Sequence, residues 1–383
     1  VTAAGAVTAN VAASLDYSSN ANLAAVDTFV IADSKTASFS AAQGAKTITL
    51  GSGSVAKVIV ASENISGTSL SASVTAIDVS DNKTAILSIA QAQLAVTLGS
   101  SAVAKMSVSA TTDVSSSTFD SDVSEFVVSA GILTVTSAQA NNQTISGAGG
   151  VTINALALDA VLTNLTASGT VTANVATGTN YTANSTLDAV DAYVVASGVA
   201  TLTSAQANGT TISGDGGLTV TGLAADANLG SVTAAGTVTA NVATSLDYST
   251  NTNLGAVGTF VVAAGATATF SGAQAVKTIT LADGTAFAKV NVATTSAGNL
   301  SGLTLDSDIS EITVASGAVA TVTSAQANNQ TISGAGGVTI NALALDAVLT
   351  NLTASGTVTA NVATGTNYTA NSTLDAVDAY VVA

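Results

Sequence analysis

The chain has 383 residues, a formal charge of −16 and no His, Cys, Pro, Trp or Arg. Because His and Cys are missing, the usual imidazole bases, thiolate nucleophiles and zinc ligands are missing too, and we expect no enzyme activity and no cofactor of that kind. The negative charge disfavours nucleic acid and anionic membrane surfaces.

Short strands are predicted throughout the chain, because β-branched runs alternate with polar residues between Ser, Gly, Asn or Asp clusters. The clearest strands are residues 28–32, 37–40, 46–50, 57–61, 134–136, 144–146, 151–153 and 170–176. One helical turn is predicted at residues 184–193, where Asn or Ser could cap it.

The composition favours a thin core. Hydrophobic residues make up 47% of the chain, mostly Ala and Val, whereas aromatic residues make up 3%. We therefore predict an all-β fold, an elongated β-solenoid in which short strands stack on one another. The alternative is a series of tandem β-sandwich domains, which would need larger core residues and units of ~100 residues.

The chain repeats itself. Residues 134–196 recur unchanged as residues 321–383, and residues 1–20 closely match residues 232–251. An intact duplicate of this length is not expected to contain a unique active site. Both ends of the sequence fall inside a repeat, so we expect the parent chain to continue on both sides or identical copies to join end to end.

A shorter period lies inside the long one. An Ala-Gln pair places glutamine at positions 43, 91, 139, 206, 274 and 326. We predict one continuous repeat array, 1–383, with approximate units 1–62, 63–112, 113–160, 161–230, 231–295 and 296–383.

Acidic side chains at alternate positions form two related motifs, DSDVSE and DSDISE. Hard oxygen ligands in this pattern could hold Ca²⁺ between turns, although they would equally suit solvated corners. The candidate calcium ligands are Asp120, Asp122, Glu125, Asp306, Asp308 and Glu311. The pairs Asp188 with Asp191 and Asp375 with Asp378 present the same two readings.

Thr-X-Thr triplets with an aliphatic centre also recur. On a solenoid the central residue would point inward and both threonines outward. Regular ladders of threonine could order water, as an ice-binding surface does. Successive triplets from Thr134 onward are separated by 36, 31, 18 and 18 residues, and this irregularity argues against a regular ladder.

Residues 238–262, followed by residues 267–281, combine an Ala-Asn-Val segment, a Leu-Asp pair and a Thr-rich strand that ends in Ala-Gln. The matching positions are Ala240, Asn241, Val242, Leu246, Asp247, Thr267, Thr269, Ala273 and Gln274. This pattern resembles the repeat region of very large repetitive bacterial cell-surface proteins. The resemblance implies a secreted adhesin, surface-layer subunit or matrix fibre, and no reaction. Many of those proteins also contain Gly-rich calcium nonapeptides, which are absent from this sequence.

We therefore expect an extracellular or cell-surface structural protein that self-assembles or continues into a fibre or lattice around a bacterial cell. Its partners would be copies of itself and possible surface glycans, without nucleic acid or membrane insertion. The alternative function is a stalk, or a glycan- or receptor-binding section, of a giant adhesin.

Overall fold

The fold is an all-β solenoid of about 19 turns, with 40% of residues in strands and 8% in helices. The structure is a computed structural model that describes residues 5–176, 178–293 and 298–382. Two compact units are present: Val1–Asn174 with Asn184–Ala192, and Val175–Ala183 with Tyr193–Ala383. One turn of the solenoid is called a rung below.

The strands are short. In chain order they are β1 (Thr8–Val11), β2 (Leu15–Asp16), β3 (Thr28–Ile31), β4 (Thr36–Phe39), β5 (Thr47–Leu50), β6 (Val55–Val60), β7 (Val74–Val79), β8 (Thr84–Leu87), β9 (Ala95–Leu98), β10 (Val103–Val108), β11 (Thr112–Asp113), β12 (Val123–Val128), β13 (Ile132–Thr136), β14 (Thr144–Ser146), β15 (Gly150–Leu156), β16 (Val171–Val175), β17 (Ala192–Val195), β18 (Val199–Thr203), β19 (Thr211–Ser213), β20 (Gly217–Thr221), β21 (Val238–Val242), β22 (Leu246–Asp247), β23 (Thr259–Val262), β24 (Thr267–Phe270), β25 (Thr278–Leu281), β26 (Phe287–Val292), β27 (Ile309–Val314), β28 (Val319–Thr323), β29 (Thr331–Gly334), β30 (Gly337–Asn341), β31 (Val358–Val362) and β32 (Ala379–Val382). These strands confirm the eight that the sequence predicts most clearly.

The helices are single turns. They are α1 (Ala41–Gly44), α2 (Ile89–Ala92), α3 (Ser137–Ala140), α4 (Ser204–Ala207) and α5 (Ser324–Ala327), with the 3-10 helices η1 (Ala21–Ala25) and η2 (Thr252–Leu254). The helical turn predicted at residues 184–193 is wrong. Asn184 Oδ1 accepts hydrogen bonds from the backbone N and the hydroxyl of Thr186, and this local turn replaces the helix.

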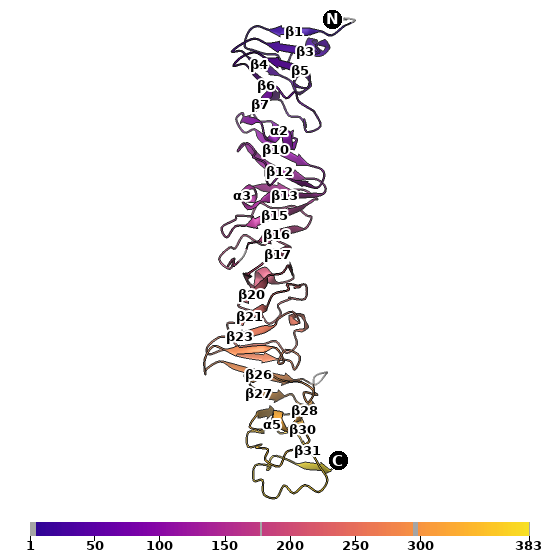
Figure 1. Ribbon diagram of the computed structural model, residues 1–383, viewed down its shortest axis with the longest axis vertical. Helices are drawn as coiled ribbons and strands as arrows, with labels where there is room; N and C mark the ends of the chain where they lie inside the picture. The colour runs from indigo at the N-terminus through magenta and orange to yellow at the C-terminus, as the bar shows by residue number, and fades with distance from the viewer. Residues whose placement is uncertain (1–4, 177, 294–297, 383) are drawn as a thin grey trace. The chain divides into compact units, whose positions relative to one another are not determined.

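Each strand pairs in parallel with a strand about one rung away in the sequence (Figure 1). Thr28 lies opposite Thr47, and Thr36 lies opposite Val55, both 19 residues further along the chain. In the first unit the sheets include β1-β3-β5, β2-β4-β6-β7-β9 and β14-β12-β10-β8; in the second they include β18-β20-β21-β23-β25, β22-β24-β26-β27-β29 and β28-β30-β31-β32. Since sandwiches are built from antiparallel sheets, the alternative of tandem β-sandwiches is wrong. The boundaries of the six sequence units stay a prediction.

The core is a column of small side chains. Along β6, Ala56, Val58 and Val60 are fully buried, and the residues between them are half-buried. This alternation is the period-2 pattern of a strand with one face on the core. Aromatic residues fill wider places, as where the rings of Phe29 and Phe39 lie 4.7 Å apart.

A register shift recurs at three places. It falls between Ala56 and Lys57, between Ala104 and Lys105, and between Ala288 and Lys289. After each shift the neighbouring strand has advanced by one extra residue, as in a β-bulge. At two of the three places the shift sets the lysine directly opposite a glutamate.

Candidate functional site: polar contacts between rungs

The glutamine at positions 43, 91, 139, 206, 274 and 326 closes a capping box with a Ser or Thr three residues earlier. Its Oε1 accepts a hydrogen bond from the backbone N of that residue at 2.8–2.9 Å, and the hydroxyl accepts one from the glutamine N. The pairs are Ser40–Gln43, Ser88–Gln91, Thr136–Gln139, Thr203–Gln206, Ser271–Gln274 and Thr323–Gln326. Such a box satisfies donors at the start of a helical turn.

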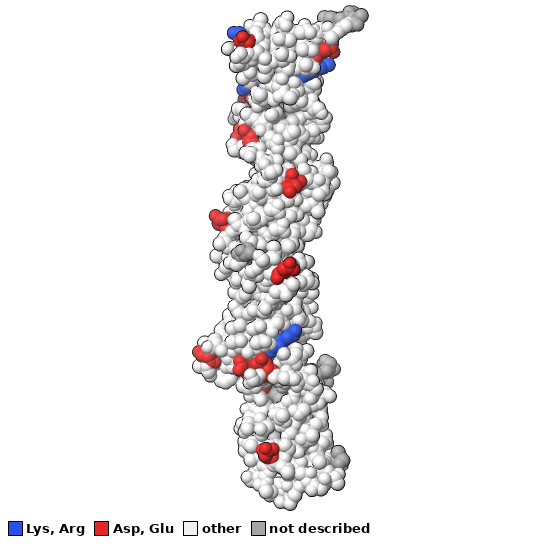
Figure 2. Space-filling model, in the orientation of Figure 1, with Lys and Arg blue, Asp and Glu red and all other residues white. Residues whose placement is uncertain are grey.

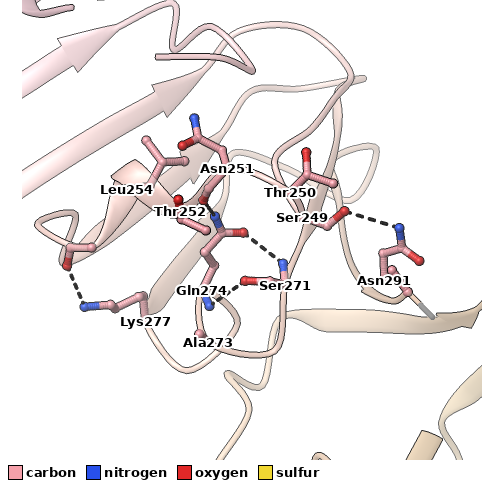
Figure 3. A pocket seen from close by; sticks show the side chains of 12 residues that line it. Ser249, Thr250, Asn251, Thr252, Leu254, Ser271, Ala273, Gln274, Lys277 and Asn291 are labelled. Carbon is pink, nitrogen blue, oxygen red and sulfur yellow. Dashed lines mark hydrogen bonds between the residues drawn. The ribbon is translucent and has the colours of Figure 1, made fainter. Parts of the chain in front are cut away.

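The same glutamines also join neighbouring rungs. Gln274 Nε2 donates to the carbonyl oxygens of Tyr248, at 3.0 Å, and Asn251, at 2.8 Å. Figure 3 shows the Gln274 side chain reaching from its own turn toward the segment that contains Asn251. Gln91 makes the equivalent bonds to Ile65 and Thr68, at 2.9 and 2.8 Å. Gln43, Gln139 and Gln326 each donate to two such carbonyls, and Gln206 donates to that of Tyr181. We call each of these six side chains a glutamine clamp.

Sequence reasoning identified the clamp positions only as markers of the repeat. The sequence did contain a signal for the capping box, since Ser or Thr lies three residues before each of these glutamines. No sequence signal identified the carbonyl acceptors, which lie 22–26 residues earlier in the chain.

A hollow of about 550 Å³ lies beside the Gln274 clamp (Figure 3). Hydroxyl and amide side chains line it, together with Lys277, whose Nζ donates to the Gly255 carbonyl at 3.2 Å. A similar hollow of about 500 Å³ lies beside the Gln91 clamp. Two of the six clamps, Gln91 and Gln274, thus have a hollow beside them.

The first predicted calcium motif forms contacts within the protein. Asp120 Oδ1 accepts a hydrogen bond from the backbone N of Asp122 at 3.0 Å. Glu125 lies 2.6 Å from the Lys105 ammonium and accepts a hydrogen bond from Ser146. Burial alone would raise the pKa of Glu125, but the hydrogen bonds from Lys105 and Ser146 hold the pKa below its usual value.

The second motif repeats these contacts. Asp306 Oδ1 accepts from the backbone N of Asp308, and Glu311 pairs with Lys289 and Ser333. The Lys289 hydrogen bond, followed by that of Ser333, lowers the pKa of Glu311. Among residues 5–176, 178–293 and 298–382, no three acidic, His or Cys side chains gather as metal ligands. Calcium binding at these residues stays a prediction.

Other polar groups also join rungs. Asp191 and Asp378 each accept a hydrogen bond at 2.8 Å from a strand residue 20 positions earlier, Val171 and Val358. The exposed Asp188 and Asp375 belong to the same pairs. Burial raises the pKa of Tyr248 to about 12, and its hydroxyl donates to the Leu223 carbonyl at 2.8 Å.

Threonines form a regular column on the outer face of β18-β20-β21-β23-β25. Consecutive register partners are Thr201, Thr219, Thr239, Thr259 and Thr278. In β18, Leu202 is buried between Thr201 and Thr203, as the sequence predicts. The inference from irregular spacing was wrong for this sheet, because loops of different length connect strands that keep the same register.

Charged side chains are sparse on the visible face, where Figure 2 shows them singly or in small groups among uncharged residues. No helix within the described residues is long and apolar enough to cross a membrane. No protein-family model matches the chain, and a search of curated proteins found no significant match.

Proposed function

We propose that this chain is a non-enzymatic structural repeat protein of the bacterial exterior, which self-assembles into a fibre or surface lattice. The proposal is supported by the use of its polar side chains. Clamp glutamines, paired glutamates and the aspartates that accept from strand backbone all bond one rung to the next.

The glutamine clamps are the main supporting observation. A catalytic site needs polar groups that converge on a substrate. In the clamps at Gln43, Gln91, Gln139, Gln274 and Gln326, by contrast, the amide oxygen accepts from one backbone N and the amide nitrogen donates to two backbone carbonyls. The repetition of one bonding pattern along the array suits a protein whose task is to remain folded and extended outside a cell.

The resemblance to repetitive cell-surface proteins supports the proposed location. Only 8% of the residues are charged, and this low share favours close packing of copies. Zero cysteine is compatible with an oxidising exterior. A stalk of a giant adhesin is the alternative that the same resemblance allows.

The test is immunogold electron microscopy of native cells with an antibody raised against residues 1–383. Label on an extracellular layer or fibre is expected, and removal of that layer by brief protease treatment of intact cells should remove the label. Label confined to the cell interior would overturn the proposal. Single, unassembled molecules bound to other cells would favour the adhesin stalk.

A further inference from the structure

Each segment that receives a clamp begins with the same kind of turn. The residue before the first carbonyl acceptor is Asn or Asp, and its Oδ1 accepts a hydrogen bond at 2.8–3.1 Å from the backbone N two positions later. This arrangement is an Asx turn. All six Asn or Asp side chains are exposed, and we call them the corner residues: Asp16, Asn64, Asp113, Asn180, Asp247 and Asn299.

The Asx turn uses only the side-chain oxygen, and for that reason Asp and Asn serve equally well at this corner. At the three Asn corners the Nδ2 group is therefore left over. Among the residues that the structure describes, neither Asn64 nor Asn180 nor Asn299 donates a hydrogen bond from Nδ2. Each of these corners thus presents an exposed primary amide that the fold does not use.

Each of the three amides begins an Asn-X-Ser/Thr sequence, NIS, NYT or NLS. Such a sequence is the acceptor motif for N-linked sugars on the surface of secreted proteins. The hydroxyl of the third residue, Ser66, Thr182 or Ser301, donates to the Asn Oδ1 at 2.6–2.8 Å. Two donors on Oδ1 stabilise the negative charge that the carboxamide develops when Nδ2 loses a proton.

A further Asn-X-Thr sequence lies four residues beyond Asn180 and differs in one respect. Asn184 has the same turn and the same hydroxyl contact, both to Thr186. Its Nδ2, however, donates to the carbonyl oxygens of Leu158 at 3.0 Å and Ala160 at 2.9 Å, which belong to the preceding rung. A sugar on this nitrogen would replace one of the two N–H donors and would separate the rungs.

The Asn-X-Thr sequence that begins at Asn208 lacks the corner geometry. The Thr210 hydroxyl donates to the Ala207 carbonyl at 2.9 Å, and the Asn208 Oδ1 accepts from the backbone N of Asn228 at 2.7 Å. The motif alone therefore does not define the site. The corner residues combine the motif with an amide nitrogen that makes no contact within the described residues.

We propose that Asn64, Asn180 and Asn299 are acceptors of N-linked sugar chains. A cellular glycosyltransferase would join Nδ2 to the anomeric carbon of a sugar diphosphate donor. The bond from that carbon to the diphosphate oxygen breaks, the diphosphate keeps the electron pair, and Nδ2 loses one proton, so nothing is oxidised or reduced. This inference rests on the proposed function, because it adds a sugar coat to a protein of the cell exterior.

A sugar at these corners is compatible with the rest of the fold. The Asn Oδ1 keeps both of its hydrogen bonds, since only Nδ2 is modified. The clamp is also unaffected, because Gln91 bonds to the backbone carbonyl of Ile65 and not to the side chain of Asn64. The exposed corner leaves the attached sugar in solvent.

Glycopeptide mass spectrometry of the protein purified from its own cells tests the proposal. Sugar is expected on the peptides that contain Asn64 and Asn299. The sequence NYTANST contains Asn180 and its control Asn184, and fragmentation should place the sugar on the first and leave the second bare. The duplicates Asn367 and Asn371 give the same peptide and repeat the same contacts.

Two variants produced in the same cells separate the amide from the motif. Asn64→Asp should abolish the sugar at this corner and preserve the turn, since Asp16 forms that turn in the native chain. Ser66→Ala keeps the amide but removes the hydroxyl, and it should abolish the sugar as well. Far-UV circular dichroism should show an unchanged strand signal for Asn64→Asp.

Bare amides at all three corners, in protein taken from labelled cell surfaces, would overturn the inference and leave the scaffold function intact. Sugar on Asn184 with Asn180 bare would overturn the assignment to the corners. Immunogold label confined to the cell interior would instead count against the scaffold function alone, because glycopeptides are identified wherever the protein lies.

Discussion

At the scale of single residues, the glutamine clamps combine burial with three hydrogen bonds from one short side chain. Gln91 is 3% exposed and contacts the Ser88 backbone N and the carbonyls of Ile65 and Thr68. Removing one partner from a buried hydrogen bond leaves the other unsatisfied, which costs more than the bond itself contributes.

Gln91→Ala should therefore reduce the free energy of unfolding by about 2–4 kcal/mol. Urea unfolding followed by circular dichroism measures the change, and hydrogen exchange of residues 60–95 should show where protection is lost. Gln93→Ala is the matched control, since Gln93 is exposed two positions further on. Equal effects of the two substitutions would mean that the clamp adds nothing to stability.

The paired glutamates predict a dependence on pH. The pKa of Glu311 is lower in the folded chain than its ordinary value of 4.5, chiefly because Lys289 donates to it. The ion pair therefore contributes stability above about pH 4.5, and this contribution is lost as the pH falls through the lower folded pKa.

Glu311→Gln should remove that part of the acid sensitivity. The loss should stay below about 1 kcal/mol at neutral pH, because Lys289 is one-third exposed and solvent screens the pair. Urea midpoints of the Glu311→Gln variant and of the unchanged chain, measured between pH 3 and pH 7, check this reduced acid sensitivity. Glu63→Gln is the control, because Glu63 is exposed. A steeper acid response of the Glu311 variant would contradict the expected sign.

Sequence reasoning could locate these residues but not their partners. The motif DSDISE identified Glu311 as acidic and repeated, and calcium was the natural ligand to expect. Lys289 lies 22 residues earlier, and a register shift between Ala288 and Lys289 sets it opposite Glu311. A one-residue shift between neighbouring strands is not visible in composition or spacing.

At the scale of strands and corners, one glycine conformation recurs. Gly334 has a φ of +108°, which L side chains rarely adopt, and a Cβ at this position would overlap the carbonyl oxygen of Val314. The close approach of one rung to the next at this corner therefore requires glycine.

Gly334→Ala should destabilise the chain by about 2 kcal/mol or more, because strain and steric overlap act together. Gly302→Ala offers a control of identical chemistry, since a Cβ there would meet open space and φ is not positive. The urea midpoints of the two variants provide the comparison. If the Gly334 variant is as stable as the control, the corner must be able to move away from Val314.

Strands were predictable because alternation is a local property. Val, Ile and Thr with a period of two placed β3, β5 and β14 correctly. The Thr201–Thr278 column was not predictable, since register is set by loops that absorb differences in length. The failed helix at residues 184–193 has the opposite cause: Asn184 can bond to Thr186 without one.

At the scale of the whole chain, stability should accumulate from rungs and from the contacts between adjacent rungs. A solenoid has few contacts between distant parts of its sequence, so its energy is close to a sum of neighbouring terms. The unchanged duplicate makes this testable with native sequence: deleting residues 134–320 joins residue 133 to residue 321 and gives the sequence of residues 1–196.

The 196-residue chain should fold with the same strand signal per residue as the complete chain. If both chains unfold cooperatively, the dependence of the unfolding free energy on urea should fall to about half, because it scales with the surface that unfolding exposes. Far-UV circular dichroism during urea unfolding measures both quantities. A short chain that fails to fold would mean that distant rungs support one another, which a sum of neighbouring contacts does not allow.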